Sequence, residues 1–162
     1  MFAALPRVVE RCGAQASGGA ITAVFSVLAE SDDIEDPLSD VMRSLLDGHI
    51  VLSRTLAEQG HYPAIDVARS VSRLMGAVAA PAEVAAAKSA VAALAQYDKA
   101  RILVDTGSYK AGSSPDIDRA VALHPALMRF LAQDLAHPEA RADAVRGLQL
   151  GLLAPQEYPH AH

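Results

Sequence analysis

The chain changes character at Pro81, and this change limits the folds that it can adopt. Before Pro81, apolar runs rich in β-branched residues alternate with short segments of helical pattern. After Pro81, the sequence is rich in alanine and carries apolar residues at three- and four-residue spacing. The first pattern is typical of an α/β sheet and the second of packed helices. The sequence therefore predicts an α/β part followed by an all-α part.

Two segments of the first part have the pattern of strands. Residues 20–29 form a nearly continuous apolar run, of the kind that is buried on both faces of a parallel sheet, and we expect a central strand there. HIVLS, residues 49–53, is the second strand, and residues 61–75 should form an extended connection that ends in a helical turn or loop. Two strands do not make a stable sheet. We therefore expect the sheet to be incomplete in this chain.

Helices are expected on both sides of Pro81. Asp36 and Pro37 are the residue types favoured at the cap and first position of a helix, which should reach Gly48. Proline at position 125 should divide the helical sequence after Ser114 into two segments. The other predicted helices cover residues 2–12, 54–59, 81–104 and 137–153, and the tail 154–162 should be disordered.

Composition excludes several classes of function. The formal net charge of -5 and the absence of a basic run argue against binding of nucleic acid. Cys12 is the single cysteine, so the chain has no disulfide framework and no thiolate metal cluster, which favours a cytoplasmic protein. We expect no membrane insertion, because no apolar stretch approaches the roughly 20 residues that span a bilayer. His49, His61, His124 and His137 lack metal-ligand spacing, so no metal site is expected.

Four segments together resemble the rotary ATP synthase catalytic subunits, and most closely their relatives that drive protein export in type III secretion and flagellar assembly. The segments are LPRVVERCG, GAITAVFSVLAESDD, DGHIVLSRTLAEQGHYPAIDVARSVSRLM and LVDTGSYKAGSSPDIDRAVALHPALMRFLAQD, within residues 2–134. The third, residues 47–75, carries the strongest resemblance. The family fold implies that residues 1–78 are the C-terminal part of a RecA-like P-loop ATPase core and that residues 79–153 are an all-α C-terminal domain.

The resemblance also implies a cellular role. Members of this family form homohexameric rings that bind ATP with Mg²⁺ and energise protein export. Their partners are a stalk protein, export chaperones and secreted protein substrates. The resemblance therefore implies a cytoplasmic protein that is peripheral to the inner-membrane export apparatus.

Particular residues fall on functional positions of the family. Arg73 matches the arginine finger, which is offered in trans to the γ-phosphate of a neighbouring subunit's nucleotide; a planar, permanently charged guanidinium suits the charge that gathers there. Tyr62 matches the aromatic residue that stacks on adenine. Phe130 is a weaker candidate for the same pocket, because the resemblance around it is looser and core packing explains it as well. Asp32, Asp33 and Glu35 fall in a loop that faces the central pore.

One family motif is absent from this sequence. No GxxxxGK[ST] motif occurs, so the chain has no glycine-rich loop of backbone N–H groups and no lysine for the β- and γ-phosphates. We therefore expect the chain alone to be inactive and to hold no cofactor. Two alternatives stay open: a non-catalytic interaction module that binds ring or stalk components, and a helical domain without a present role. In either of them Arg73 is an ordinary solvated arginine and Tyr62 a packing residue.

Overall fold

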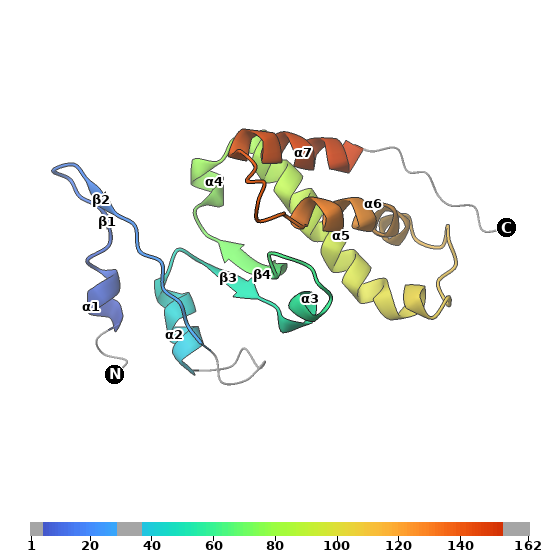
Figure 1. The fold of residues 1–162 in the computed structure, drawn as a ribbon, viewed down its shortest axis with the longest axis horizontal. Coiled ribbons are helices and arrows are strands. Elements are labelled where there is room, and N and C mark those ends of the chain that lie inside the picture. Colours follow the sequence, from blue (N-terminus) through green and yellow to red (C-terminus); the bar gives the residue numbers. More distant parts are fainter. Residues whose placement is uncertain (1–4, 29–36, 154–162) are drawn as a thin grey trace. The chain divides into compact units, whose positions relative to one another are not determined.

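The computed structural model describes residues 5–28 and 37–153, coloured along the chain in Figure 1. The chain divides into two compact units, residues 1–49 and residues 50–162. The α/β character of the first part and the helical character of the rest are both confirmed. The predicted pore-loop residues Asp32, Asp33 and Glu35 and the tail 154–162 lie outside the described residues.

The described residues of the first unit form two helices and a short hairpin. Helix α1 spans Leu5–Val9 and helix α2 spans Pro37–Leu45, which confirms both expected helices with shorter bounds. Strands β1 (Gly13–Ala14) and β2 (Ala20–Ile21) pair antiparallel, with Gly13 opposite Ile21. Met42 in α2 is the buried core residue that this unit contributes within the described ranges.

The central strand predicted for residues 20–29 is wrong in extent. Of the described residues 20–28, only Ala20–Ile21 is a strand, and Val24 and Leu28 are each 94% exposed. A strand that is buried on both faces needs neighbouring strands and covering layers, and among the described residues β2 pairs only with β1. The apolar run therefore stays without the burial that its sequence predicts.

The second unit begins within strand β3 (Gly48–Leu52), the first strand of a pair. Strand β3 pairs with strand β4 (Ile65–Ser72), and helix α3 (Arg54–Glu58) lies between them in the sequence. The Ser53 hydroxyl caps α3 by accepting a hydrogen bond from the Leu56 N–H at 3.3 Å. The predicted extended connection of residues 61–75 is therefore a loop, the strand β4 and the start of helix α4 (Met75–Val78).

Three helices complete the second unit, and Figure 1 shows them side by side. They are α5 (Pro81–Asp105), α6 (Pro115–Leu131) and α7 (Arg141–Leu153). Both α5 and α6 begin with proline, as predicted, because the first helical residue needs no N–H partner. Their core consists of Ala90, Leu123 and Leu127, against which Ala93, Leu94, Leu148 and Leu152 pack.

The predicted break at Pro125 does not occur, since α6 continues through it. Proline inside a helix costs about 3 kcal/mol, because it lacks an N–H and its ring crowds the preceding turn. Pro125 is exposed, whereas Ala120, Leu123 and Leu127 of the same helix are buried. Burial of this apolar face on both sides of Pro125 offsets the cost, and the helix stays whole.

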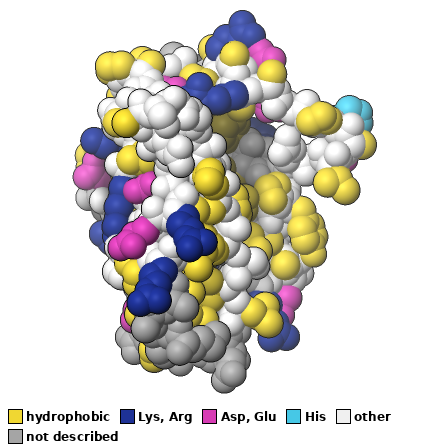
Figure 2. Space-filling model, turned by 90° about the vertical axis from the view of Figure 1, so that its left-hand side faces the viewer, with side chains coloured by type: hydrophobic (Ala, Val, Ile, Leu, Met, Phe, Trp, Pro, Cys, Tyr) yellow, Lys and Arg dark blue, Asp and Glu magenta, His cyan; other side chains and the backbone are white. Residues whose placement is uncertain are grey.

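Apolar side chains are frequent at the surface. On the face drawn in Figure 2, hydrophobic side chains lie among basic and acidic ones. In the first unit the exposed apolar residues include Val8, Ile21, Val24 and Leu28. None of the helices in the described ranges combines the length and apolar character needed to cross a bilayer.

Candidate functional site

Strand β4 places the two principal candidate residues at its opposite ends. Tyr62 precedes the strand and Arg73 follows it directly. Between them β4 is bent, because the Ser70 hydroxyl reaches the carbonyl oxygen of Asp66, four residues earlier, at 2.6 Å. The whole of β4 therefore separates Tyr62 from Arg73 along the chain.

Tyr62 lies in the short loop between α3 and β4, and its side chain is 58% exposed. Gly60 turns the chain into this loop with a φ of 73°, a left-handed conformation that glycine adopts without strain. The His61 N–H bonds back to the Leu56 carbonyl oxygen at 2.9 Å. On the other side, the Tyr62 carbonyl oxygen accepts a hydrogen bond of 2.8 Å from the backbone N–H of Gln133, just after α6.

Arg73 is exposed, and an irregular stretch of β4 leads to it. The Ser70 hydroxyl donates to the Asp66 carbonyl oxygen at 2.6 Å and accepts from the Val51 N–H at 3.0 Å. The Asp66 carboxylate in turn accepts from the Arg69 N–H at 3.1 Å. These bonds fix the end of the strand from which Arg73 extends.

Phe130 contributes to the contact between α6 and α7. It is partly buried, and a Cβ placed on Gly147 of α7 would lie 3.7 Å from the Cε2 atom of Phe130. The ring of Phe130 therefore lies beside Gly147, at ordinary contact distance from a methyl group placed there. Three residues after Phe130, Gln133 makes its bond to Tyr62, so the loop of Tyr62 and the end of α6 that carries Phe130 are neighbours.

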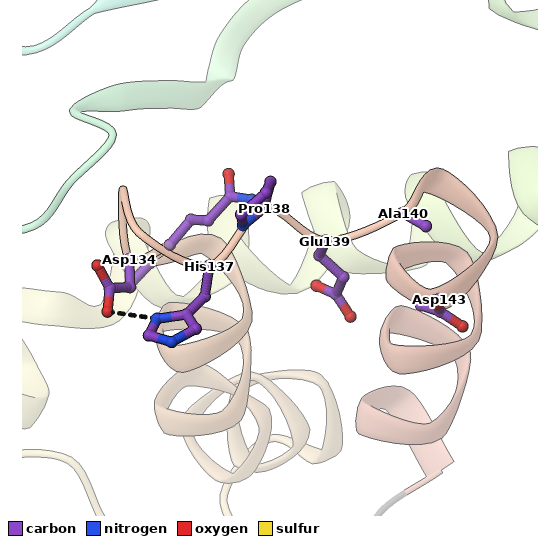
Figure 3. A pocket seen from close by; sticks show the side chains of 8 residues that line it. Asp134, His137, Pro138, Glu139, Ala140 and Asp143 are labelled. Carbon is purple, nitrogen blue, oxygen red and sulfur yellow. Dashed lines mark hydrogen bonds and ion pairs between the residues drawn. The ribbon is translucent and has the colours of Figure 1, made fainter.

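The segment between α6 and α7 lines a pocket of about 540 Å³. In Figure 3, Asp134 and His137 point toward each other, and the Asp134 Oδ2 and His137 Nδ1 atoms lie 2.9 Å apart. The pKa of Asp134 is lowered, first by the hydrogen bond from the Ala136 N–H and then by the bond to His137. The remaining lining residues are Ala132, Gln133, Pro138, Glu139, Ala140 and Asp143.

Sequence reasoning did not find this pocket or the bond between Gln133 and Tyr62. The bond joins two backbone groups and leaves no trace in residue type. The Asp134 turn does have a local signal, because aspartate often accepts the N–H two residues later. Within the described ranges, no group of three or more His, Cys, Asp and Glu side chains could hold a metal ion.

Two family models match the chain. Residues 1–72 match the ATP synthase alpha/beta family, nucleotide-binding domain, and residues 79–150 match the T3SS EscN ATPase C-terminal domain. Together the two matches cover most of the sequence. The first match falls on the α/β part of the chain and the second on the helices that follow it.

Curated relatives agree with these matches. The chain is 46% identical over 145 residues to a flagellum-specific ATP synthase of Pseudomonas aeruginosa, covering 89% of this chain and 32% of the relative. It is also 46% identical over 148 residues to a type 3 secretion system ATPase of Pseudomonas syringae pv. tomato, covering 91% of this chain and 33% of the relative. The chain thus spans about a third of the length of the curated relatives that it matches.

Solved structures give the same result. The assembled ATPase EscN from the enteropathogenic E. coli type III secretion system matches with a TM-score of 0.87 at 37% identity, over 93% of this chain and 36% of that chain. EscN in complex with its central stalk EscO matches with a TM-score of 0.82 at 34% identity. This match covers 93% of this chain and 35% of that chain. The fold seen here is the fold of the corresponding part of EscN.

Proposed function

The chain belongs to the family of type III secretion and flagellar export ATPases, and we propose that it is the C-terminal part of an ATPase that energises protein export. In this proposal it supplies an arginine finger, Arg73, and an adenine-stacking ring, Tyr62, to a ring-shaped assembly. The placement of these two residues at opposite ends of β4 carries the proposal.

The separation supports action on two different nucleotides. The eight residues of β4 separate Arg73 from Tyr62 along the chain. An arrangement in which Tyr62 serves its own subunit and Arg73 serves a neighbour satisfies this geometry. Arg73 would then stabilise the charge that develops on the transferred phosphoryl group, an effect commonly worth a thousandfold or more in rate.

The exposure of Tyr62 supports its role as a stacking platform. Tyr62 is 58% exposed while its backbone carbonyl is held by Gln133. Stacking of a base on such a ring contributes about 1–3 kcal/mol and discriminates little between bases. Phe130 is proposed only as a neighbour of this site, because its ring packs beside Gly147.

Assembly follows from the relatives by analogy. EscN is described as an assembled ATPase and in complex with a central stalk, so we propose a hexameric ring and a stalk partner for this protein as well. Asp32, Asp33 and Glu35 would face the pore of that ring, and export chaperones and secreted substrates would dock on the helical domain. The proposed division between the domains lies at residues 78 and 79. Such a protein would work on the cytoplasmic side of the export apparatus.

The chain alone is proposed to be inactive. ATP with Mg²⁺ would require the glycine-rich loop and lysine that this sequence lacks. Apolar residues such as Val24 and Leu28, which are exposed here, support packing of the first unit against a further segment. That segment would bring the phosphate-binding groups.

The test is reconstitution. This chain is mixed with the part of the Pseudomonas aeruginosa relative that it does not match, and ATP hydrolysis is measured for the mixture and for each component; we call the mixture the reconstituted ATPase. We expect activity only in the mixture. Arg73→Ala should lower kcat by about a thousandfold with little change in nucleotide binding, and Arg73→Lys should recover only part of it.

Two results would contradict the proposal. One is an association of the two components without any ATP hydrolysis, and the other is an Arg73→Ala variant with wild-type kcat. Either would favour the alternative of a non-catalytic module that binds ring or stalk components. The exposed apolar surface of the first unit is the observation that supports this second function.

A further inference from the structure

We propose that the backbone N–H of Gln133 is a positioning group for the Tyr62 ring, so that the end of α6 sets the affinity of the adenine site. The inference rests on the proposed stacking role of Tyr62. It adds a link between the helical part of the chain and nucleotide binding. Gln133 would not touch the nucleotide and would act only through Tyr62.

The geometry of the helix end presents the donor. Helix α6 ends at Leu131, and Ala132 leaves the helix with extended backbone angles, φ -81° and ψ 129°. Its N–H still bonds to the Met128 carbonyl oxygen at 3.1 Å. The next N–H, that of Gln133, therefore points away from the helix and reaches the Tyr62 carbonyl oxygen at 2.8 Å.

The donor is held on both sides along the chain. Before it, Leu127 is buried in the core between the helices and Phe130 packs beside Gly147 of α7. After it, Asp134 accepts hydrogen bonds from the Ala136 N–H and the His137 ring, which closes a turn. A donor that is held on both sides thus bonds to the backbone of the residue that carries the exposed aromatic ring.

This arrangement matters for binding because a stacking ring must be ordered when the base arrives. If the ring is ordered beforehand, less conformational entropy is lost on binding. If the bond between Tyr62 and Gln133 raises the affinity for the nucleotide by some factor, then by linkage the bound nucleotide strengthens that bond by the same factor. Both directions of this coupling can be measured.

The first experiment compares two variants of Gln133 in the reconstituted ATPase. Gln133→Pro removes the N–H, and the extended conformation of Ala132 is compatible with a following proline. Gln133→Ala removes the side chain and keeps the N–H. We expect Gln133→Pro to raise the KM for ATP severalfold with kcat little changed, and Gln133→Ala to match the wild type. Equal KM values in the two variants would overturn the inference.

Tyr62→Ala separates this inference from the proposed function. If Gln133 acts through Tyr62, adding Gln133→Pro to Tyr62→Ala should raise the KM no further. An additive rise would overturn the inference while the stacking role stands. If Tyr62→Ala alone leaves the KM unchanged, the proposed stacking role of Tyr62 fails instead, and the inference fails with it.

A second measurement needs no variant. Hydrogen exchange at the Gln133 amide is followed in the complete chain and in the reconstituted ATPase with and without ATP. We expect a protected amide in the chain alone, and slower exchange when ATP is bound. An unprotected Gln133 amide, or an exchange rate that ATP leaves unchanged, would overturn the inference even if Gln133→Pro does not fold.

Discussion

The ring of His124 lies flat on the ring of Tyr97, with centroids 3.5 Å apart and planes inclined by 10°. Tyr97 belongs to α5 and His124 to α6, so the stack joins the two longest helices beside their shared core. It places a titratable group in the contact between the helices. The stability of the helical part should therefore depend on pH.

Stability should fall as the pH drops below about 6.5. Burial lowers the pKa of His124 below 6.5, with nearby Arg101 acting in the same direction and Asp98 and Asp105 opposing it. His124 therefore binds a proton more readily in the unfolded chain than in the folded chain. As the pH falls, stability is lost from about pH 6.5 down to the pKa of His124 in the folded state. Urea unfolding of the chain at several pH values measures this loss.

His124→Phe is the matched variant, because it keeps a ring that can stack on Tyr97 and cannot take up a proton. The difference in unfolding free energy between the wild type and this variant should depend on pH only below about 6.5. If the difference in unfolding free energy stays constant below about pH 6.5, His124 has the same pKa in the folded and unfolded states.

Ser70→Ala should destabilise the β3–β4 pair. The Ser70 hydroxyl accepts the Val51 N–H at 3.0 Å and is partly buried, so its removal takes away this acceptor. We expect a loss of about 0.5–1.5 kcal/mol in unfolding free energy. Ser72→Ala, at an exposed position of the same strand, is the control and should change stability by less than about 0.5 kcal/mol. Equal losses in the two variants would exclude a role for the Ser70 hydroxyl.

Asp118→Ala should loosen the loop between α5 and α6. The Asp118 carboxylate accepts from the Tyr109 hydroxyl at 2.8 Å and from the Gly112 N–H at 3.0 Å. Hydrogen bonds to a charged group contribute about 1.5–3 kcal/mol, so we expect a loss of this size in thermal or urea unfolding. Asp116→Ala should cost about 0.3–1 kcal/mol, because this exposed carboxylate only interacts with the helix dipole. A loss of stability for Asp116→Ala that is larger than the loss for Asp118→Ala would contradict the prediction.

Gly147→Ala should stabilise α7. Its Cβ would lie 3.7 Å from Phe130, which is ordinary contact, and alanine favours a helix over glycine by about 0.5–1 kcal/mol. Gly151→Ala, where the Cβ meets nothing within 4 Å, should give a similar gain. Gly147→Leu should instead cost about 1–3 kcal/mol by overpacking against Phe130. Circular dichroism melts measure all three, and a stable Gly147→Leu would show that Phe130 moves freely.

The helices of the second part were predictable because their signals are local. Pro81 and Pro115 start α5 and α6 at the expected positions, since proline needs no N–H partner there. The alanine and leucine spacing marks the face that forms the core around Leu123 and Leu127. Strand β4 was harder to predict, because its pairing with β3 is a long-range contact and its burial does not alternate.

The sequence by itself determined the family, the helical end and the candidates Arg73 and Tyr62, because these depend on residue type and spacing. Tertiary structure decided three other matters. Packing on both sides of Pro125 kept α6 whole, and the end of α6 met the loop of Tyr62 through Gln133. Residues 22–28 stayed without a sheet because no described segment of the chain pairs with them. Each depends on which surfaces or backbone groups meet in space. Every residue except proline carries the same N–H and C=O groups, so residue type cannot show which pairs will bond.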